Sequence, residues 1–393
     1  MENSKAPPPE LCVDNLRVIK LLGKGATGTV FLVSDVSSDH PFALKVVQKS
    51  SARHHADRRA RHEIAVLSRL AAGHPFLPPL IGFSEDRDFI CWGIPYCPGG
   101  DLNALRHRQS DGVFSAAVIR FYVAEIVSAV EYLHGRGIVY RDLKPENILV
   151  QLSGHVTLTD FDLSRDLQAR REPGAGRRAR DFYSDREEDK PTRKKKRTFQ
   201  KKSKSARVSP VSRRAPAAAA AAAGDSSADE RCYSFVGTEE YLSPEVIRGD
   251  GHDFAVDWWA VGILAYEMLY GTTPFKGRDR KDTFRRILLA DPKFMGKPNL
   301  LTDLIKNLLE KDPTRRLGYG GASEIKGHGF FRGLRWELLT EVSRPPFLPL
   351  ESERDQMTGN PAVSFVEYFQ AQPPPLRSPS LDETHDNVSL TEF

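Results

Sequence analysis

Tyr140-Arg141-Asp142-Leu143-Lys144-Pro145-Glu146-Asn147 is the segment of this 393-residue sequence that decides the fold. A chance occurrence of the spacing Asp-x-Lys-Pro-x-Asn is improbable. Asp142 can orient a hydroxyl and accept its proton, and Lys144 can neutralise charge that develops on a transferred group. Asn147 can bind a metal ion. The segment therefore predicts a catalytic loop for transfer of a charged group.

A second acidic motif, Asp160-Phe161-Asp162, follows thirteen residues after Asn147. It comes directly after a predicted strand over residues 155–159. Asp160 offers a carboxylate of the kind that Mg²⁺ prefers, at a place where the ion could bridge phosphate oxygens.

A glycine-rich turn lies near the N-terminus, Gly23-Lys24-Gly25-Ala26-Thr27-Gly28-Thr29-Val30. Glycines let the backbone approach phosphate oxygens closely and donate N–H groups to them. Taken alone, the pattern also fits an ordinary hairpin turn. A dinucleotide-binding fingerprint would be followed by a helix, but residues 29–36 predict a strand.

Lys45 and Glu63 extend this phosphate site. Lys45 lies in the next predicted strand, residues 42–48, and Glu63 lies in a predicted helix over residues 58–72. Each alone would be an ordinary solvated residue. At this spacing after the glycines, Lys45 is predicted to hold the α- and β-phosphates, and Glu63 to fix the lysine by pairing with it.

The order of predicted elements indicates an α+β fold with two lobes. A strand over residues 16–25 precedes those above, and a long amphipathic helix over residues 114–137 has Ser115 as its N-cap. Residues 16–331 are predicted to form one domain, with a small β-rich lobe, a larger α-helical lobe and a hinge near residues 94–101. A flexible arm, residues 1–15, and a Pro-rich tail, residues 332–393, flank it.

The net charge of +5 is unevenly distributed. Residues 165–231 contain 20 Lys and Arg against 10 Asp and Glu, a net charge of +10, so the rest of the chain carries −5. The segment also contains seven consecutive alanines, residues 217–223, and few large apolar residues. It cannot offset the entropy lost on ordering, and is predicted to be a disordered insertion within the domain.

Cysteines and apolar runs exclude other classes of protein. Cys12, Cys91, Cys97 and Cys232 show no CxxC spacing, so we expect a reducing compartment without disulfides or zinc. No apolar run approaches the roughly 20 residues that span a bilayer, and the N-terminus does not resemble a secretory signal.

Together these motifs resemble a eukaryotic Ser/Thr protein kinase of the AGC group, to which the cyclic-AMP-dependent kinase belongs. Residues 237–245 resemble the end of an activation segment, and residues 257–262 resemble the helix that braces the catalytic loop. Arg316 matches an arginine that pairs with Glu245. Asp162, which replaces the usual glycine, and the long basic insertion are similar to the plant AGC group VIII kinases. The resemblance covers residues 16–393 apart from the insertion.

The resemblance implies transfer of the γ-phosphoryl group of ATP to Ser/Thr hydroxyls of proteins, in plant growth or developmental signalling. It implies a bilobal protein-kinase-like fold, and Mg²⁺, or alternatively Mn²⁺, as cofactor. The implied catalytic residues are Asp142, Lys144 and Asn147, and the implied metal ligands are Asn147 and Asp160. The implied ATP site contains Gly23, Lys24, Gly25, Gly28, Val30, Ala43, Lys45, Glu63, Ile94, Cys97, Asp101 and Phe365.

Two positions depart from the family pattern. Asp162 could alter the preference between Mg²⁺ and Mn²⁺ as a third carboxylate near the metals, or it could face solvent. The hinge reads Ile94-Pro95-Tyr96-Cys97, without the usual glutamate. Pro95 lacks an N–H, but adenine needs the N–H of Cys97, so ATP binding is expected to survive.

The resemblance also implies regulation by phosphorylation. Ser234 matches the activation-segment phosphosite, whose phosphate would be held by Arg141; the alternative is an unmodified serine in a turn. Leu390 and Phe393 resemble a terminal hydrophobic motif that docks on the small lobe and recruits the phosphoinositide-dependent kinase. The alternative is a frayed terminus. The protein is expected to be a monomer.

Substrate selection is predicted from three carboxylates, Asp101, Glu146 and Glu267, at positions that bind arginine in basophilic members. Arginine binds carboxylates as a bidentate fork. We therefore expect protein substrates with Arg or Lys two or three residues before Ser/Thr.

The basic run Arg193–Arg197 leaves several roles open: a nuclear import receptor, an anionic lipid, a nucleic acid, or none. Expected locations are the cytoplasm and nucleus, with peripheral plasma-membrane association as an alternative. Two rival functions remain, a pseudokinase scaffold and a lipid- or nucleic-acid-binding protein in which the kinase domain is secondary.

Overall fold

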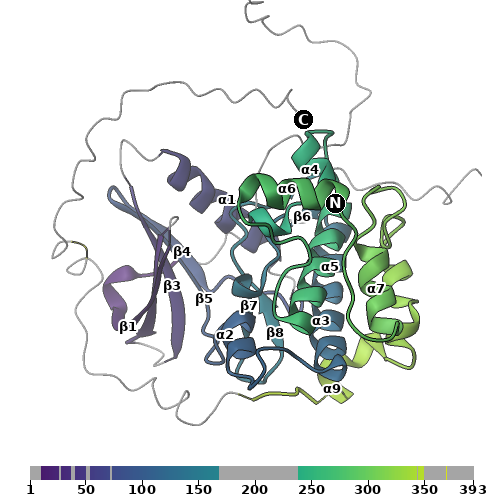
Figure 1. Cartoon of the computed structure of the whole chain (residues 1–393). Coiled ribbons are helices and arrows are strands. Elements are labelled where there is room, and N and C mark those ends of the chain that lie inside the picture. Colours follow the sequence, from purple (N-terminus) through teal and green to yellow (C-terminus); the bar gives the residue numbers. More distant parts are fainter. Residues whose placement is uncertain are drawn as a thin grey trace, which may run out of the picture. The chain divides into compact units, whose positions relative to one another are not determined.

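The computed structural model describes residues 10–25, 28–36, 40–49, 54–70, 73–167, 238–342, 344–348 and 369. Several predicted features lie outside these residues: most of the basic insertion, and the residues Ser234, Phe365, Leu390 and Phe393. The described elements form an antiparallel sheet with one long helix, followed by a mainly helical part (Figure 1). This confirms the predicted α+β, two-lobed kinase-like fold.

The sheet of the small lobe has five antiparallel strands in the order β1-β2-β3-β5-β4. Buried apolar side chains recur along these strands and make cores on both faces of the sheet. The strands are β1 (Leu16–Gly25), β2 (Gly28–Asp35), β3 (Pro41–Gln48), β4 (Gly82–Glu85) and β5 (Phe89–Pro95).

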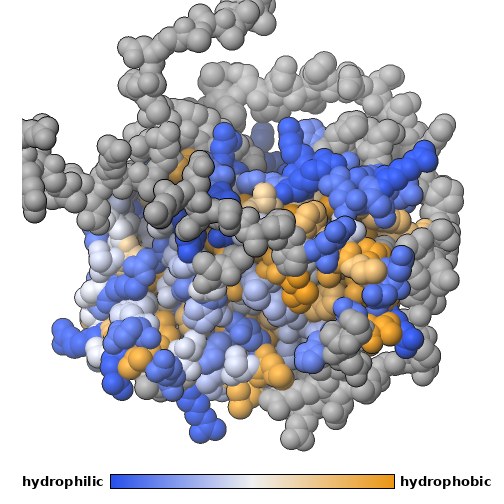
Figure 2. Space-filling view, turned by 180° about the vertical axis from the view of Figure 1, so that it is seen from behind, coloured by the Kyte–Doolittle hydropathy of each residue, from blue (hydrophilic) through white to orange (hydrophobic). Residues whose placement is uncertain are grey.

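Helix α1 (His54–Leu70) covers one face of this sheet. Ala60, Ile64 and Leu67 lie on one side of the helix at helical spacing, and all three are buried in the main core. Figure 2 shows hydrophilic side chains gathered along α1 and apolar ones over the neighbouring strands. Because the apolar side of α1 is buried in the core, the other side of the helix is available for polar contacts.

The large lobe is built around α5 (Ala255–Tyr270), whose side chains are buried along almost its whole length. It contacts α3 (Ala116–Gly135), whose N-cap Ser115 accepts a hydrogen bond from Val118 N, as predicted. The other helices are α2 (Leu102–His107), α4 (Pro244–Arg248), α6 (Arg280–Leu289), α7 (Leu300–Leu308), α8 (Ala322–Lys326) and α9 (Leu339–Val342).

Two short strand pairs support the catalytic segments: β6 (Ile138–Val139) with β9 (Arg165–Asp166), and β7 (Ile148–Val150) with β8 (Val156–Leu158). The start of the predicted insertion is therefore wrong, because residues 165–167 continue the fold and Leu167 N donates to Gly137 O at 2.7 Å. The 3-10 turns are η1 (Val13–Asn15), η2 (Pro145–Asn147), η3 (Glu239–Tyr241), η4 (Gly329–Phe331) and η5 (Trp336–Leu338).

Both predicted flanks contribute to the packing. In the arm, Leu11 N donates to Phe83 O at 2.9 Å, and Leu11 and Val13 pack on the sheet. Beyond residue 331, Trp336 packs on Phe331, and Leu339 is buried. Described residues on both sides of the predicted domain, residues 16–331, thus pack against it. Among the described helices, none is long and apolar enough to cross a membrane.

Candidate active site

Lys45 joins three elements through its ammonium group. Its Nζ donates to Glu63 Oε2 of α1 at 2.8 Å and to Asp160 Oδ1, beyond β8, at 2.7 Å. Burial alone would lower the pKa of Lys45, but the charges of Glu63 and Asp160 outweigh it and raise the pKa, so the amine stays protonated. The structure thus brings together three residues that are far apart in sequence.

Trp92 on β5 was not singled out from the sequence, and it pairs with Lys45 across the sheet. The Lys45 ammonium lies 5.2 Å from the centre of the Trp92 ring. A cation at this distance from an indole is attracted by the ring. Cross-strand register was the only signal that could have identified Trp92, and the sequence does not reveal register.

The glycine-rich turn joins β1 to β2, the strand that pairs with β3 beside Lys45. Gly25 pairs with Gly28 across the turn, and Val30 lies opposite both Gly23 and Lys45 in the sheet. A Cβ on Gly28 would lie 2.8 Å from Val46 O, so this position needs a glycine for the close approach of β2 to β3. Residues 26–27, at the tip, lie outside the described part of the chain.

The hinge follows β5. Ala43 lies opposite Ile94 in the sheet, and both are predicted ATP-site residues. Cys97 lies just beyond the strand, and burial raises the pKa of its thiol to about 12, so the side chain stays neutral. Asp101 caps α2 by accepting a hydrogen bond from Ala104 N at 2.7 Å.

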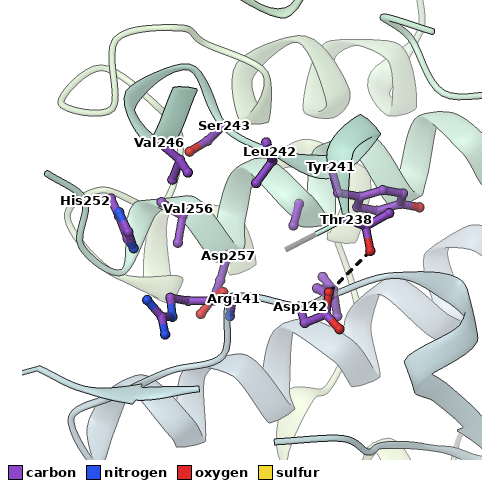
Figure 3. A pocket seen from close by; sticks show the side chains of 12 residues that line it. Arg141, Asp142, Thr238, Tyr241, Leu242, Ser243, Val246, His252, Val256 and Asp257 are labelled. Carbon is purple, nitrogen blue, oxygen red and sulfur yellow. Dashed lines mark hydrogen bonds between the residues drawn. The ribbon is translucent and has the colours of Figure 1, made fainter. Parts of the chain in front are cut away.

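The carboxylate of Asp142 is held by the other predicted catalytic residues. Lys144 Nζ donates to its Oδ2 at 2.7 Å, and Asn147 Nδ2 donates to its Oδ2 and backbone carbonyl at 2.9 Å each. Thr238 Oγ1 donates to its Oδ1 at 3.4 Å (Figure 3). Thr238 was predicted only as part of the activation segment. It adds a link from that segment to the predicted base.

Asp257 of α5 fixes the backbone of the catalytic loop. Its carboxylate accepts hydrogen bonds from Tyr140 N, Arg141 N and His134 Nε2, all at 2.8 Å. Arg141 has φ of 68°, in the left-handed region that a side chain normally avoids. The two backbone bonds to Asp257 hold this conformation. Both side chains line the pocket drawn in Figure 3. Its volume is about 20 Å³, which is too small for a nucleotide.

Two oxygen atoms remain that could hold a divalent cation. Asn147 Nδ2 donates to Asp142, so Asn147 Oδ1 is left as a metal ligand. Asp160 Oδ1 accepts from Lys45, so Asp160 Oδ2 is left as the second ligand. Hard oxygen donors, few in number and supplemented by substrate phosphates, suit Mg²⁺. In the part of the chain that the structure describes, no group of three or more His, Cys, Asp or Glu side chains could hold a metal.

A lysine paired with two carboxylates, opposite an aspartate held by lysine and asparagine, is the arrangement that phosphoryl transfer from ATP requires. The chain belongs to the protein kinase family. The family model described as "Protein kinase domain" matches residues 16–185 and 219–331.

Curated plant kinases resemble the chain over its full length. The Serine/threonine-protein kinase UCN of Arabidopsis thaliana is 54% identical, covering 100% of this chain and 98% of the relative. UCNL of the same plant is 54% identical, covering 95% and 94%. OXI1 is 45% identical, covering 89% and 82%. The chain is therefore a Ser/Thr protein kinase of the plant AGC type, which confirms the resemblance; kinases of this family use ATP and a divalent metal and act on proteins.

The activation segment of this kinase is anchored to the large lobe by a buried pair. Arg316 donates to Glu245 at 2.7 and 2.9 Å, the pairing that the sequence predicts. Burial would raise the pKa of Glu245, but its bonds to Arg316 lower the pKa below its usual value. The carboxylate therefore stays charged inside the protein.

The three predicted substrate carboxylates differ in how far they are already engaged. Glu267 accepts hydrogen bonds from Tyr241 Oη at 2.6 Å and from Arg106 at 3.3 Å. Glu146 is exposed and accepts one bond from Asn103 Nδ2 at 3.1 Å. Neither Asn103 nor Arg106 was singled out from the sequence, because their link to the carboxylates depends on the tertiary fold.

Asp162 does not face solvent, so that alternative is wrong. Its side chain is only 6% exposed, and its Oδ2 lies 3.6 Å from a guanidinium nitrogen of Arg59 on α1. Burial and the nearby charge of Asp160 raise the pKa of Asp162, whereas Lys45 and Arg59 oppose the rise. The residue that departs from the family pattern is thus built into the contact between α1 and the metal-binding segment.

Proposed function

We propose that this kinase transfers the γ-phosphoryl group of Mg-ATP to Ser/Thr hydroxyls that follow arginine or lysine by two or three residues. The observation that carries the proposal is that Lys45 Nζ donates hydrogen bonds to both Glu63 and Asp160, which supports an assembled phosphate site. The exposed carboxylate of Glu146 supports the basic preference. The small set of hard oxygen donors suits Mg²⁺, and Mn²⁺ is the alternative that the same donors would also accept.

The residues of the chain divide the chemistry between them. Lys45 would hold the α- and β-phosphates, and Asn147 and Asp160 would hold a divalent metal, which would neutralise charge on the phosphates. Asp142 orients the substrate hydroxyl and accepts its proton. Lys144, bonded to Asp142, is placed to stabilise charge on the transferred group.

Regulation is proposed to follow the AGC pattern. Phosphorylation of Ser234 by a phosphoinositide-dependent kinase would add charge that Arg141 can hold, and Leu390 with Phe393 would recruit that enzyme. The basic insertion would serve nuclear import or binding to anionic lipid. A monomer in the cytoplasm and nucleus, acting in growth or developmental signalling, completes the proposal; the names of the relatives support only the kinase activity.

Phosphoryl transfer to a peptide tests the function directly. Wild type is compared with Asp142→Asn and with Asp111→Asn, an exposed carboxylate that serves as control. We expect kcat to fall by about 10²- to 10⁴-fold for Asp142→Asn alone. Equal rates for all three proteins, or no transfer by the wild type after phosphorylation of Ser234, would favour the pseudokinase scaffold.

Substrate preference needs a second comparison. A peptide with arginines two and three residues before the serine is measured beside the same peptide with alanines there. We expect the arginine peptide to have the higher kcat/KM, and Glu146→Gln to reduce the difference, because a charge-assisted bond is lost. A preference that is absent in wild type contradicts the basophilic assignment without affecting the kinase activity.

A further inference from the structure

Helix α1 and the segment after Asp160 meet through a series of polar contacts. Arg59 lies 3.6 Å from Asp162, and His62 Nε2 is bonded to Ser164 O at 2.8 Å. Further along, Arg69 forms an ion pair with Asp166. A carbonyl only accepts, so the Nε2 of His62 carries the proton in the bond to Ser164.

The contacts join one face of α1 to the turn that follows Asp160 and to the short strand β9. Positions 59, 62 and 69 differ by three and seven residues, so they share a face of the helix. Asp162 and Ser164 lie in a turn, in which Ser164 N donates to Phe161 O at 3.1 Å, and Asp166 lies in β9. One face of α1 therefore contacts this segment at three successive points.

The Arg59–Asp162 contact lies closest to the phosphate site. Arg59 precedes Glu63 by four residues, about one helical turn, so both lie on the same face of α1. Asp162 follows Asp160 by two residues. One pair thus ties the helix that carries Glu63 to the segment that carries Asp160, and both carboxylates bond Lys45. The usual glycine at position 162 could not make this contact.

We propose that Arg59 and Asp162 are a positioning pair, which holds α1 in the rotation where Glu63 bonds Lys45. This proposal rests on the proposed function. Arg59 is 46% exposed, which limits the strength of an ion pair. The carboxylate of Asp162, however, is almost completely buried, and a buried charge that loses its partner is destabilised. The contact therefore favours the assembled site over arrangements in which α1 turns away.

The test is a double-mutant cycle with Arg59→Gln, Asp162→Asn and the double variant. Exposed Arg58 of the same helix, which contacts His55, supplies the matched control Arg58→Gln. We expect each single change to lower kcat/KM for ATP about fivefold, the ratio that corresponds to about 1 kcal/mol. The double variant should be no worse than either single one, and KM for the peptide should stay unchanged.

Two further measurements separate positioning from general damage. Arg59→Lys keeps the charge and should recover most of kcat/KM, and calorimetric titration with ADP should show weaker binding in Arg59→Gln but not in Arg58→Gln. Additive losses in the cycle, an effect of Arg58→Gln as large as that of Arg59→Gln, or no effect of Arg59→Gln would overturn the proposal. Failure of the proposed function would appear differently, as a wild type that transfers no phosphate.

Discussion

Replacing Asp257 by asparagine removes the group that holds the catalytic loop while keeping its size. The aspartate accepts three hydrogen bonds, two of them from the backbone N–H groups of Tyr140 and Arg141. An asparagine has one carbonyl oxygen, and its NH₂ group cannot accept. Whichever way the amide is turned, one backbone N–H next to Asp142 faces another donor.

The magnitude of the effect comes from the backbone N–H that loses its acceptor. A buried N–H without an acceptor costs about 1–3 kcal/mol, and Tyr140 is fully buried. The left-handed backbone of Arg141 costs about 1–3 kcal/mol in both proteins, so it adds nothing to the difference, but it persists only while its surroundings impose it. The loop that carries Asp142 is therefore favoured by about 1–3 kcal/mol less. At 1.36 kcal/mol per tenfold, kcat should fall about fivefold or more.

The assay is steady-state peptide phosphorylation, with kcat and KM for ATP measured separately. Asp250→Asn, an exposed acidic position near the start of α5, is the control. The effect should appear in kcat, because Lys45 and Asp160 hold the nucleotide side independently of Asp257. A folded Asp257→Asn variant with kcat within twofold of wild type would refute the reasoning.

Three other perturbations test separate parts of the structure. Gly28→Ala places a Cβ 2.8 Å from Val46 O, and overpacking of about 1–3 kcal/mol should lower the urea midpoint and raise KM for ATP. Arg316→Met leaves the Glu245 carboxylate buried without a cation, which should lower the free energy of unfolding in denaturant by about 3–5 kcal/mol. Adding Glu245→Gln to the same chain should recover part of that loss. Burial and the charge of Arg141 lower the pKa of His252 to about 4, so His252 binds a proton more readily in the unfolded chain than in the folded protein. The free energy of unfolding should therefore fall as the pH is lowered from 6.5 to 4. His252→Asn should reduce that slope; an unchanged slope contradicts the assignment.

The fold could be predicted from local patterns in the sequence. Apolar runs around the glycine-rich turn located β1, β2 and β3 of the small lobe, although β4 and β5 were not predicted, and Ser115 located the start of α3. Both signals depend only on neighbours in the chain. The catalytic loop could be predicted for a related reason. Its three functional groups lie within one short segment, so their proximity did not depend on the tertiary fold.

Contacts between distant segments could not be predicted in the same way. Two alternatives stayed open for Asp162, a role near the metals or exposure to solvent, because its burial depends on where α1 lies. Glu267 was predicted to bind substrate, yet its engagement by Arg106 and Tyr241 depends on how α2, η3 and α5 pack. The ordered residues 10–15 were missed, because a short apolar pair shows no period before its partner sheet is known.

The site has two groups of charges that are organised by different means. On the nucleotide side, Lys45 is held by direct ion pairs with Glu63 and Asp160, so a change there should alter the affinity for ATP as well as the rate. On the hydroxyl side, Asp142 is oriented by hydrogen bonds within a loop whose backbone Asp257 fixes, so a change there should alter the rate alone. Catalysis by preorganised charges needs both groups in place before the reaction begins. Variants of Arg59 and of Asp257 should therefore be separable by kinetics, the first through ATP and the second through turnover, although each residue lies outside direct contact with the reacting atoms.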